Sequence, residues 1–442
     1  MKKEEDIDLI SLIGIVVGLG LLVLFAFKGS SLVWAAPLAA MVVALTGGLE
    51  LLPAYLENYM GGFVGFTQTW FPTFMLSAIF GKILETSGAA QSLTIWIVDK
   101  LGRDKAIFIS LIAGGILAYG GISGFVIIFT MYPIVLSLFK EADIPVRLIP
   151  ATIMVGAFQF AMVAPGAPTI QNLIPGNHFG TPPGSAPVIG WTSSLLMFLL
   201  AFLWLQYRVK SLKANGEGYS EPVKGVEEVA TEKLPSPILS SLVPFIFILI
   251  FLNLFGQAIE TSLIVGILTA LIFNFSSLRK QKESLRRVFN IGAKSSISAI
   301  INTSAAVGFG TVVQAVPGFE VLTDAVLGLS ENPLIGMTIA VNILAGATGS
   351  ASGGLEIALS SLAGRFIEAS EVTGINLEAF HRISAMSSGG LNTMPHDGAV
   401  VTYLDYSGVS HKAGYFDMFI TSGLIPVLVT VIAIIMGSLG VV

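Results

Sequence analysis

Two polar stretches interrupt the apolar second half of the chain, and their residue types could bind a small anion and move a proton. Residues 346–354 read Gly-Ala-Thr-Gly-Ser-Ala-Ser-Gly-Gly, and residues 392–399 read Asn-Thr-Met-Pro-His-Asp-Gly-Ala. Hydroxyl and amide side chains donate hydrogen bonds to anions, and glycine lets the backbone approach an anion closely. Histidine has an ordinary pKa of about 6.5, so His396 could exchange a proton near neutral pH.

The first half of the chain carries a similar pair of stretches. Residues 120–124 read Gly-Gly-Ile-Ser-Gly, and residues 164–168 read Ala-Pro-Gly-Ala-Pro. Aligning Gly120 with Gly349 gives an offset of 349 − 120 = 229, and aligning Pro165 with Pro395 gives 395 − 165 = 230. Because the two landmarks agree, we expect a duplicated unit.

An anion at these stretches would be bound by backbone and hydroxyl groups, because none of the four stretches contains lysine or arginine. A helix that begins after Gly124 or Gly354 presents about half a positive charge and free N–H groups at its N-terminus. The predicted substrate-binding residues are Ser123, Thr169, Asn172, Ser350, Ser352, Asn392, Thr393 and His396. The alternative role for the glycines and serines is close packing between helices.

Three residues at predicted membrane depth are candidates for proton coupling: His396, Asp397 and Glu356. The alternative is a structural role, for instance His396 bonded to a loop carbonyl, or Glu356 paired within its own hairpin. Asn302 and Thr303 interrupt an apolar helix and could line a cavity or bridge helices. The remaining histidines are expected at the membrane interface near helix ends: His178, His381 and His411.

The composition places these residues in a polytopic membrane protein. The chain has 442 residues, of which 54% are hydrophobic and 12% charged, against about 25% charged in soluble domains. The net charge of −5 and the short basic clusters exclude a nucleic-acid-binding face. The absence of cysteine excludes a disulfide framework and a thiolate metal site, and we expect no metal centre and no cofactor other than a coupling ion.

About 20 apolar residues span a bilayer as a helix, and several apolar segments are too short or too interrupted to cross alone. We therefore predict re-entrant hairpins at 104–139 and 333–368, and helices broken by proline and glycine at 146–180 and 377–408. The two repeats are then 1–207 and 237–442, joined by the linker 208–236. The predicted spans are 8–27, 33–52, 63–84, 104–118, 125–139, 146–164, 187–207, 237–256, 259–275, 288–315, 333–346, 355–368, 377–391 and 415–438.

Charge in the loops predicts that the repeats are inverted. The linker 208–236 and the loop 276–287 are rich in lysine and arginine and are expected in the cytoplasm. Basic residues flank the first hairpin, whereas mainly acidic residues flank the second, so the two should open to opposite sides. This topology places the N-terminus outside. Inverted repeats with discontinuous helices that meet at the midplane are typical of secondary transporters.

Four ordered motifs give the chain its resemblance to a known family: residues 119–123, 164–172, 347–354 and 394–399. Together they resemble the gluconate permease (GntP) family of the ion transporter superfamily, over nearly the whole chain. The resemblance implies an elevator-type fold, proton-coupled uptake of small hydroxy-acid anions across the inner membrane, and a homodimer.

The second broken helix departs from the gluconate-transporting members. In those members the second broken helix contains a Ser-His-x-Asn-Asp element followed by Gly-Phe-Trp. This chain instead has His396-Asp397-Gly398 and continues into 399–403 without tryptophan. Another short hydroxy- or keto-carboxylate, such as 3-hydroxybutyrate, acetoacetate or lactate, is therefore at least as suitable as gluconate. The alternatives are a sodium-coupled carrier of the same fold and, in other classes, a channel or a membrane enzyme.

Overall fold

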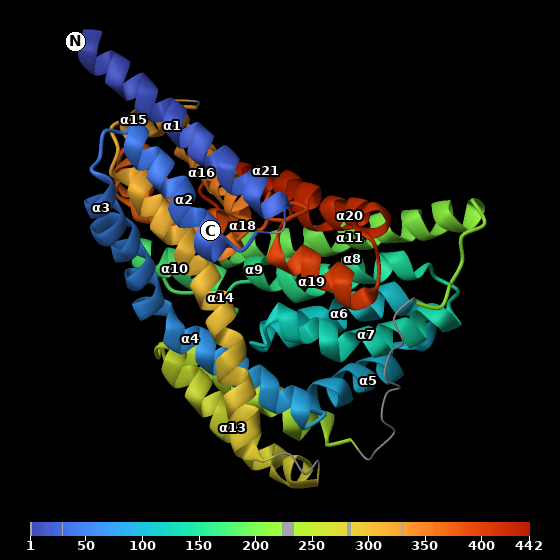
Figure 1. The fold of residues 1–442 in the computed structure, drawn as a ribbon. Helices are drawn as coiled ribbons and strands as arrows, with labels where there is room; N and C mark the ends of the chain where they lie inside the picture. The colour runs from blue at the N-terminus through green and yellow to red at the C-terminus, as the bar shows by residue number, and fades with distance from the viewer. Residues whose placement is uncertain (1, 29, 223–233, 281–283, 329) are drawn as a thin grey trace.

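The computed structural model describes residues 1–442 except 1, 29, 223–233, 281–283 and 329. The predictions for residues 223–233 of the linker and 281–283 of the second basic loop lie outside the described residues. The described part of the chain is helical and contains no strand (Figure 1). Seven of its helices are long and apolar enough to cross a membrane.

The first half of the chain contains two long helices, a hairpin, a discontinuous helix and a final long helix. Its elements are α1 (Lys2–Phe27), α2 (Leu32–Thr46), α3 (Leu51–Pro53), η1 (Ala54–Tyr59), α4 (Met60–Thr86), α5 (Ala89–Leu101), η2 (Arg103–Lys105), α6 (Ala106–Tyr119), α7 (Gly124–Glu141), η3 (Val146–Leu148), α8 (Ile149–Met154), η4 (Val155–Phe160), α9 (Ala161–Val163), α10 (Ile170–Phe179) and α11 (Pro187–Ala214). The hairpin is α6 and α7, and its tip is residues 120–123, called the first tip. The first break is residues 164–169, between α9 and α10.

The second half follows the same order. Its elements are η5 (Ile238–Leu242), α12 (Val243–Leu249), η6 (Ile250–Leu254), α13 (Ile259–Lys280), α14 (Leu285–Gln314), α15 (Gly318–Leu327), α16 (Pro333–Thr348), α17 (Ala351–Thr373), α18 (Leu377–Ser388), α19 (Gly398–Ser407), α20 (His411–Phe419), η7 (Ile420–Leu424) and α21 (Ile425–Ser438). Here α16 and α17 form the hairpin, and residues 349–350 are the second tip. The second break is residues 389–397, between α18 and α19.

The element bounds match between the halves at the offset found in the sequence. Adding 229 to the bounds of α6 gives 335–348, and α16 spans Pro333–Thr348. Adding 229 to α5 gives 318–330, and α15 spans Gly318–Leu327. This agreement supports the duplication, while the inverted orientation of the two copies stays a prediction.

Three expectations about the elements were wrong. Helices α5 and α15 lie between predicted spans, because each is too short and too polar for a search with a 20-residue apolar window. The predicted span 33–52 ends early, at Thr46, where Gly47 and Gly48 terminate α2, and the next helix begins at Leu51 and not at 63. The second break starts at 389, three residues before the polar stretch 392–399 that marks it in the sequence, because Gly389 and Gly390 already end α18.

The helices form two groups (Figure 1). Helices α1, α2, α4 and α14 lie along one side of the molecule, and α1, α2, η1 and α14 share an apolar core that includes Ile15, Val43 and Phe309. The hairpins and discontinuous helices form the second group. The groups meet closely where α14 crosses α17, since a Cβ on Gly310 would lie 2.6 Å from the side chain of Ile357.

Candidate functional site

The first tip begins the half-helix α7 without a side-chain cap. Ser123 stands at the N-cap position, and its carbonyl accepts from the N–H of Val126 at 2.8 Å. The hydroxyl of Ser123 is partly exposed and makes no hydrogen bond within the described chain. Gly121 has φ +93°, a left-handed conformation that lets the chain reverse within the four residues of the tip. The first turn of α7 therefore offers N–H groups and a hydroxyl to an anion.

The second tip begins α17 and is capped from within. Gly349 has φ +58°, and the Oγ of Ser350 accepts from the N–H of Gly353 at 3.1 Å. Ser352 follows in the first turn, is 8% exposed and makes no side-chain hydrogen bond within the described residues. Of the two predicted serines here, Ser350 stabilises the helix start and Ser352 has its hydroxyl available for a ligand.

The first break is braced by Asn172, which is fully buried. Its Nδ2 donates to the carbonyls of Ala167 at 2.9 Å and Pro183 at 3.0 Å. Thr169 is the N-cap residue of α10, but its hydroxyl donates backwards to the carbonyl of Ala161 at 3.4 Å. Both amide hydrogens of Asn172 are thus used by the fold, while the first N–H groups of α10 have no side-chain cap.

A buried arginine that we did not predict also contacts the first break. Arg382 of α18 is 0% exposed, and all five of its N–H groups donate, to the carbonyls of Val163, Pro183 and Ser185 and to Oδ1 of Asn172. No carboxylate of the described residues lies within salt-bridge distance of its guanidinium. Because Val163 ends α9, Arg382 caps the C-terminus of one half-helix from another discontinuous helix.

His381, next to Arg382, is also buried, which corrects the expectation of an interfacial position. Its Nδ1 lies 2.7 Å from the hydroxyl of Thr181, and its Nε2 lies 3.4 Å from Oδ1 of Asn172. His381 lies near the start of the predicted span 377–391, where an interfacial position was expected, but residues 379–390 are all buried in protein. His411 is exposed, as expected near a helix end.

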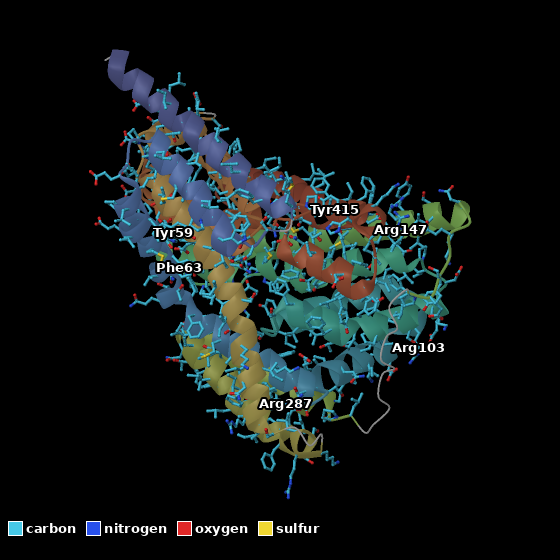
Figure 2. All side chains as sticks on the ribbon, viewed as in Figure 1. Tyr59, Phe63, Arg103, Arg147, Arg287 and Tyr415 are labelled. Atoms are coloured by element: carbon cyan, nitrogen blue, oxygen red, sulfur yellow. The ribbon has the colours of Figure 1, made fainter. Side chains whose placement is uncertain are left out.

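The second break is fixed by its neighbours in both halves. Thr393 is buried and donates to the carbonyl of Ser422 at 2.8 Å, and Gln159 of η4 donates to the same carbonyl at 2.8 Å. The hydroxyl of Tyr415, labelled on α20 in Figure 2, donates to the carbonyl of Thr393 at 3.2 Å. Asn392 is 7% exposed, and its Nδ2 makes no hydrogen bond among the described residues, so it is available for a ligand.

His396 and Asp397 connect the second break to the second tip and to α19. Asp397 is 5% exposed and caps α19, since its Oδ1 accepts from the N–H of Val400 at 2.9 Å. The ring of His396 interacts with the backbone of Gly346 and Ala347. It also lies against the tip, because a Cβ on Gly349 would be 2.7 Å from its Cδ2. Both residues therefore make contacts that fit the structural role, which the sequence left as the alternative to proton coupling.

Glu356 pairs across the two halves and not within its hairpin. Its Oε1 lies 3.2 Å from Nε2 of His178, in the last turn of α10. Thr303 is buried on α14 and donates to the carbonyl of Ala299 at 3.1 Å, whereas Asn302 is partly exposed and makes no side-chain hydrogen bond within the described residues. Of this pair, only Asn302 has polar atoms free to line a cavity.

The tips and breaks of the two halves are interleaved. Each incoming hairpin helix packs on the first part of its own discontinuous helix, α6 on η4 and α16 on α18. Each outgoing hairpin helix packs on the second part of the other one, α7 on α19 and α17 on α10. The hydroxyl of Tyr403 on α19 donates to the carbonyl of Gly124 at 2.7 Å, and joins the first tip to the second discontinuous helix. Four half-helix N-termini thus belong to one assembly.

These N-termini differ in what they leave open. Asp397 caps α19 with a carboxylate and Ser350 caps α17 with a hydroxyl, whereas α7 and α10 have no side-chain cap. Uncapped N-termini attract an anion through their N–H groups and the helix dipole. The starts of α7 and α10 can therefore each attract a carboxylate, and Ser123, Ser352 and Asn392 carry donors that no other described side chain or backbone group uses.

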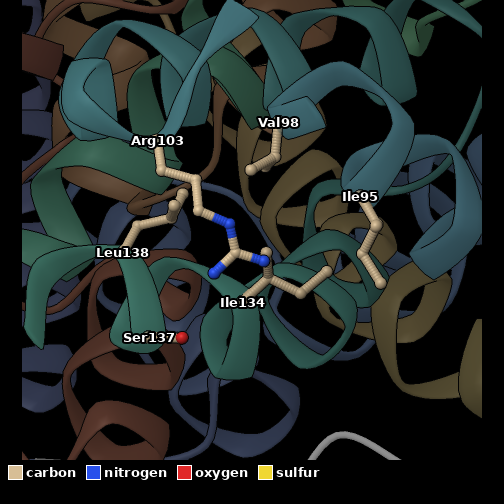
Figure 3. A pocket seen from close by; sticks show the side chains of 6 residues that line it. All are labelled: Ile95, Val98, Arg103, Ile134, Ser137 and Leu138. Carbon is tan, nitrogen blue, oxygen red and sulfur yellow. The ribbon is translucent and has the colours of Figure 1, made fainter. Parts of the chain in front are cut away.

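A pocket of about 150 Å³ lies elsewhere, at the base of the first hairpin (Figure 3). Its lining is mostly apolar, and the guanidinium of Arg103 extends into it in Figure 3 and pairs with Glu141 at 2.6 Å. It contacts neither tip and neither break, so we do not assign it to the substrate. The lining residues are Ile95, Val98, Arg103, Ile134, Ser137 and Leu138.

Comparisons with known proteins agree with this architecture. The model of the family described as "GntP family permease" matches residues 9–439. The "Uncharacterized transporter YxjC" of Bacillus subtilis (strain 168) is 37% identical over 450 residues, which cover 92% of this chain and 95% of the relative. The crystal structure of the YdaH transporter of Alcanivorax borkumensis, described as having an unusual topology, is 15% identical, with a TM-score of 0.56 over 88% of each chain. The last likeness concerns the fold alone.

Proposed function

The chain belongs to the GntP family of permeases, and from this premise we propose that it is a proton-coupled symporter of a small hydroxy- or keto-monocarboxylate. It is a multi-pass membrane protein, and its family and its relative are described as a permease and a transporter. The substrate class, the coupling ion and alternating access between the two sides of the membrane are the proposed part.

The observation that carries the proposal is the pair of uncapped half-helix starts, α7 at the first tip and α10 at the first break. A carboxylate accepts hydrogen bonds only, and these starts offer donors only. Ser123, Ser352 and Asn392 add donors that no other group of the described chain uses. A site of this kind suits one carboxylate with a polar oxygen beside it, which is the chemistry of a short hydroxy or keto acid.

The charge of such a substrate is the physical reason for coupling to a cation. An isolated anion inside a membrane protein is costly, and a cation that moves with it reduces this cost. A proton needs only a titratable side chain, and the chain provides Glu356, Asp397 and His396 in this assembly. Sodium would need several oxygen ligands, for which unwound carbonyls of the breaks are the available source.

We also propose in which membrane the protein resides and how many copies assemble. Apolar side chains are exposed along α1 and α13, among them Val16 and Ile272, and we assign these surfaces to lipid of the cell (inner) membrane. We also propose the homodimer that the family resemblance implies. Light scattering of the purified protein in detergent, corrected for bound detergent, tests it, and a monomer mass would remove this part alone.

The substrate and the coupling ion can be tested together. A thermal-shift screen of short hydroxy and keto acids on the purified protein first identifies a ligand. Uptake of that ligand into proteoliposomes is then driven by a pH gradient without sodium, or by a sodium gradient at fixed pH. We expect accumulation with the pH gradient. Accumulation with sodium only would establish the sodium-coupled carrier, and equilibration without accumulation under either gradient would refute coupling to either ion, as expected for a channel.

A further inference from the structure

Among the described residues, His178 and Glu356 form the one salt bridge between a hairpin and the discontinuous helix of the other half. His178 lies in the last turn of α10, and Glu356 lies in the second turn of α17. Their side chains are 21% and 17% exposed, and the Nε2 to Oε1 distance is 3.2 Å. The second carboxylate oxygen, Oε2, is buried and has no hydrogen-bond partner within the described residues. The pair is therefore partly buried and has one buried, unused proton acceptor.

The other two candidates for the proton are used by the fold. Asp397 holds the first turn of α19 through the N–H of Val400, and His396 interacts with the backbone next to the second tip. A proton on Asp397 would weaken the start of α19, and His396 is already held against the second tip. Glu356 caps no helix, and the hydrogen bond of its side chain goes to His178 alone. A proton at this pair changes a contact between the two halves and leaves both helices intact.

The position of the pair connects it to the proposed carboxylate site. Glu356 follows the cap residue Ser350 by six residues, about 9 Å along α17, and His178 follows Thr169 by nine residues, about 13.5 Å along α10. Both helices begin at the tip or break that carries donors for the substrate. The contact between α10 and α17 therefore joins the second hairpin to the first discontinuous helix. A movement of one against the other would change the surroundings of a titratable group there.

Among the described residues, the helices packed on α17 place no cation other than His178 within salt-bridge distance of Glu356. These helices are α10, α14, α16 and α18, and α16 has no ionisable residue. On α14 the cations Arg286, Arg287 and Lys294 all precede Ala306, which faces Gly353, by at least 12 residues or about 18 Å. On α18, Glu378 accepts from the N–H of Ala186, and His381 and Arg382 contact Asn172. The exposed Arg365, Glu368 and Glu371 lie further along α17 itself.

We propose that His178 and Glu356 together bind the proton that is transported with the carboxylate. Without the proton the pair is a carboxylate beside a neutral imidazole, with a net charge of −1. One proton, taken from the water on one side of the membrane, gives a neutral pair, and it leaves to the water on the other side. A monoanion and one proton then move together without net charge. This inference rests on the proposed proton symport and names the group that carries it.

The test separates proton coupling from the movement of the substrate. Proteoliposomes with wild-type protein or Glu356→Gln are assayed for accumulation driven by a gradient of one pH unit, and for exchange of labelled against unlabelled substrate at equal pH. One proton per anion allows about tenfold accumulation per pH unit. We expect wild-type protein to accumulate substrate and Glu356→Gln to reach only the outside concentration, with exchange still present. Glu371→Gln, an exposed carboxylate on the same helix, is the matched control and should behave as wild type.

Each remaining outcome decides the inference. Accumulation by Glu356→Gln at the wild-type level would overturn it. So would a folded Glu356→Gln protein that has lost both exchange and accumulation. If Glu356→Gln does not fold, His178→Gln is measured in the same way, with the same two outcomes. A wild-type protein that accumulates nothing under the pH gradient would instead refute the proposed symport, so the two failures are distinct.

Discussion

Replacing Arg382 with methionine should destabilise the protein, because four acceptors depend on its five hydrogen bonds. The carbonyls of Val163 and Ser185 would lose every partner found in the structure, whereas Pro183 and Asn172 would keep one or more. A buried acceptor without a partner costs about 1–3 kcal/mol, so two cost about 2–6 kcal/mol. Burying the guanidinium charge is itself unfavourable, so its removal offsets part of this loss of free energy of unfolding. We expect a net loss of stability.

The assay is thermal unfolding of the purified protein in detergent, followed by tryptophan fluorescence. The matched control is Arg365→Met, because Arg365 pairs with Asp324 at 2.6 Å with side chains 43% and 70% exposed. An exposed ion pair contributes about 0.2–1 kcal/mol. We expect Arg382→Met to lower the midpoint by several degrees and Arg365→Met to lower it slightly. Equal midpoints for the two variants would refute the reasoning that α18 holds the first break through this side chain.

Substitutions at three further positions test the tips and the second break. Asp397→Ala should cost about 0.5–2 kcal/mol of stability and Asp397→Asn much less, since asparagine caps helices as aspartate does; equal losses in fluorescence-monitored unfolding would contradict the capping role. Gly349→Ala should cost about 1–2 kcal/mol, because alanine is strained at φ +58° and its Cβ would meet His396. Gly364→Ala, with nothing within 4 Å, is its control, and equal stability of the two would argue against the tip geometry. Ser352→Ala should raise KM for uptake about 2- to 13-fold, the value of one hydrogen bond of 0.5–1.5 kcal/mol, and an unchanged KM would remove Ser352 from the site.

The interrupted architecture could be predicted because membrane burial leaves a strong trace in sequence. Glycine, serine and proline inside apolar segments have few explanations at membrane depth, so the tips at 120–123 and 349–350 and the break at 164–169 lie where the sequence placed them. Helices α5 and α15 were not predicted because they are short and contain polar residues, so they do not meet the length and hydropathy expected of a membrane span. Their shared offset, which equals that of the predicted duplication, was the signal that could have found them.

The roles of the site residues were harder to predict, because they depend on partners far away in sequence. Asp397 before Gly398 is a readable capping signal, since aspartate is a preferred N-cap residue. Arg382 was missed because an arginine five residues into a helix is usually interfacial, whereas this one is surrounded by segments around 163, 172 and 185. The His178 contact of Glu356 joins residues 178 positions apart, and no local pattern reports it.

The most direct test of the proton-coupled transport claim is the pH inside proteoliposomes that hold a trapped pH-sensitive dye. The carboxylate identified by the thermal-shift screen is added outside, in sodium-free buffer of equal pH on both sides. Protein-free liposomes correct for passive entry of the undissociated acid. The account predicts acidification of the interior that depends on the protein and rises with the amount of carboxylate taken up. Uptake of labelled carboxylate without this acidification would contradict it.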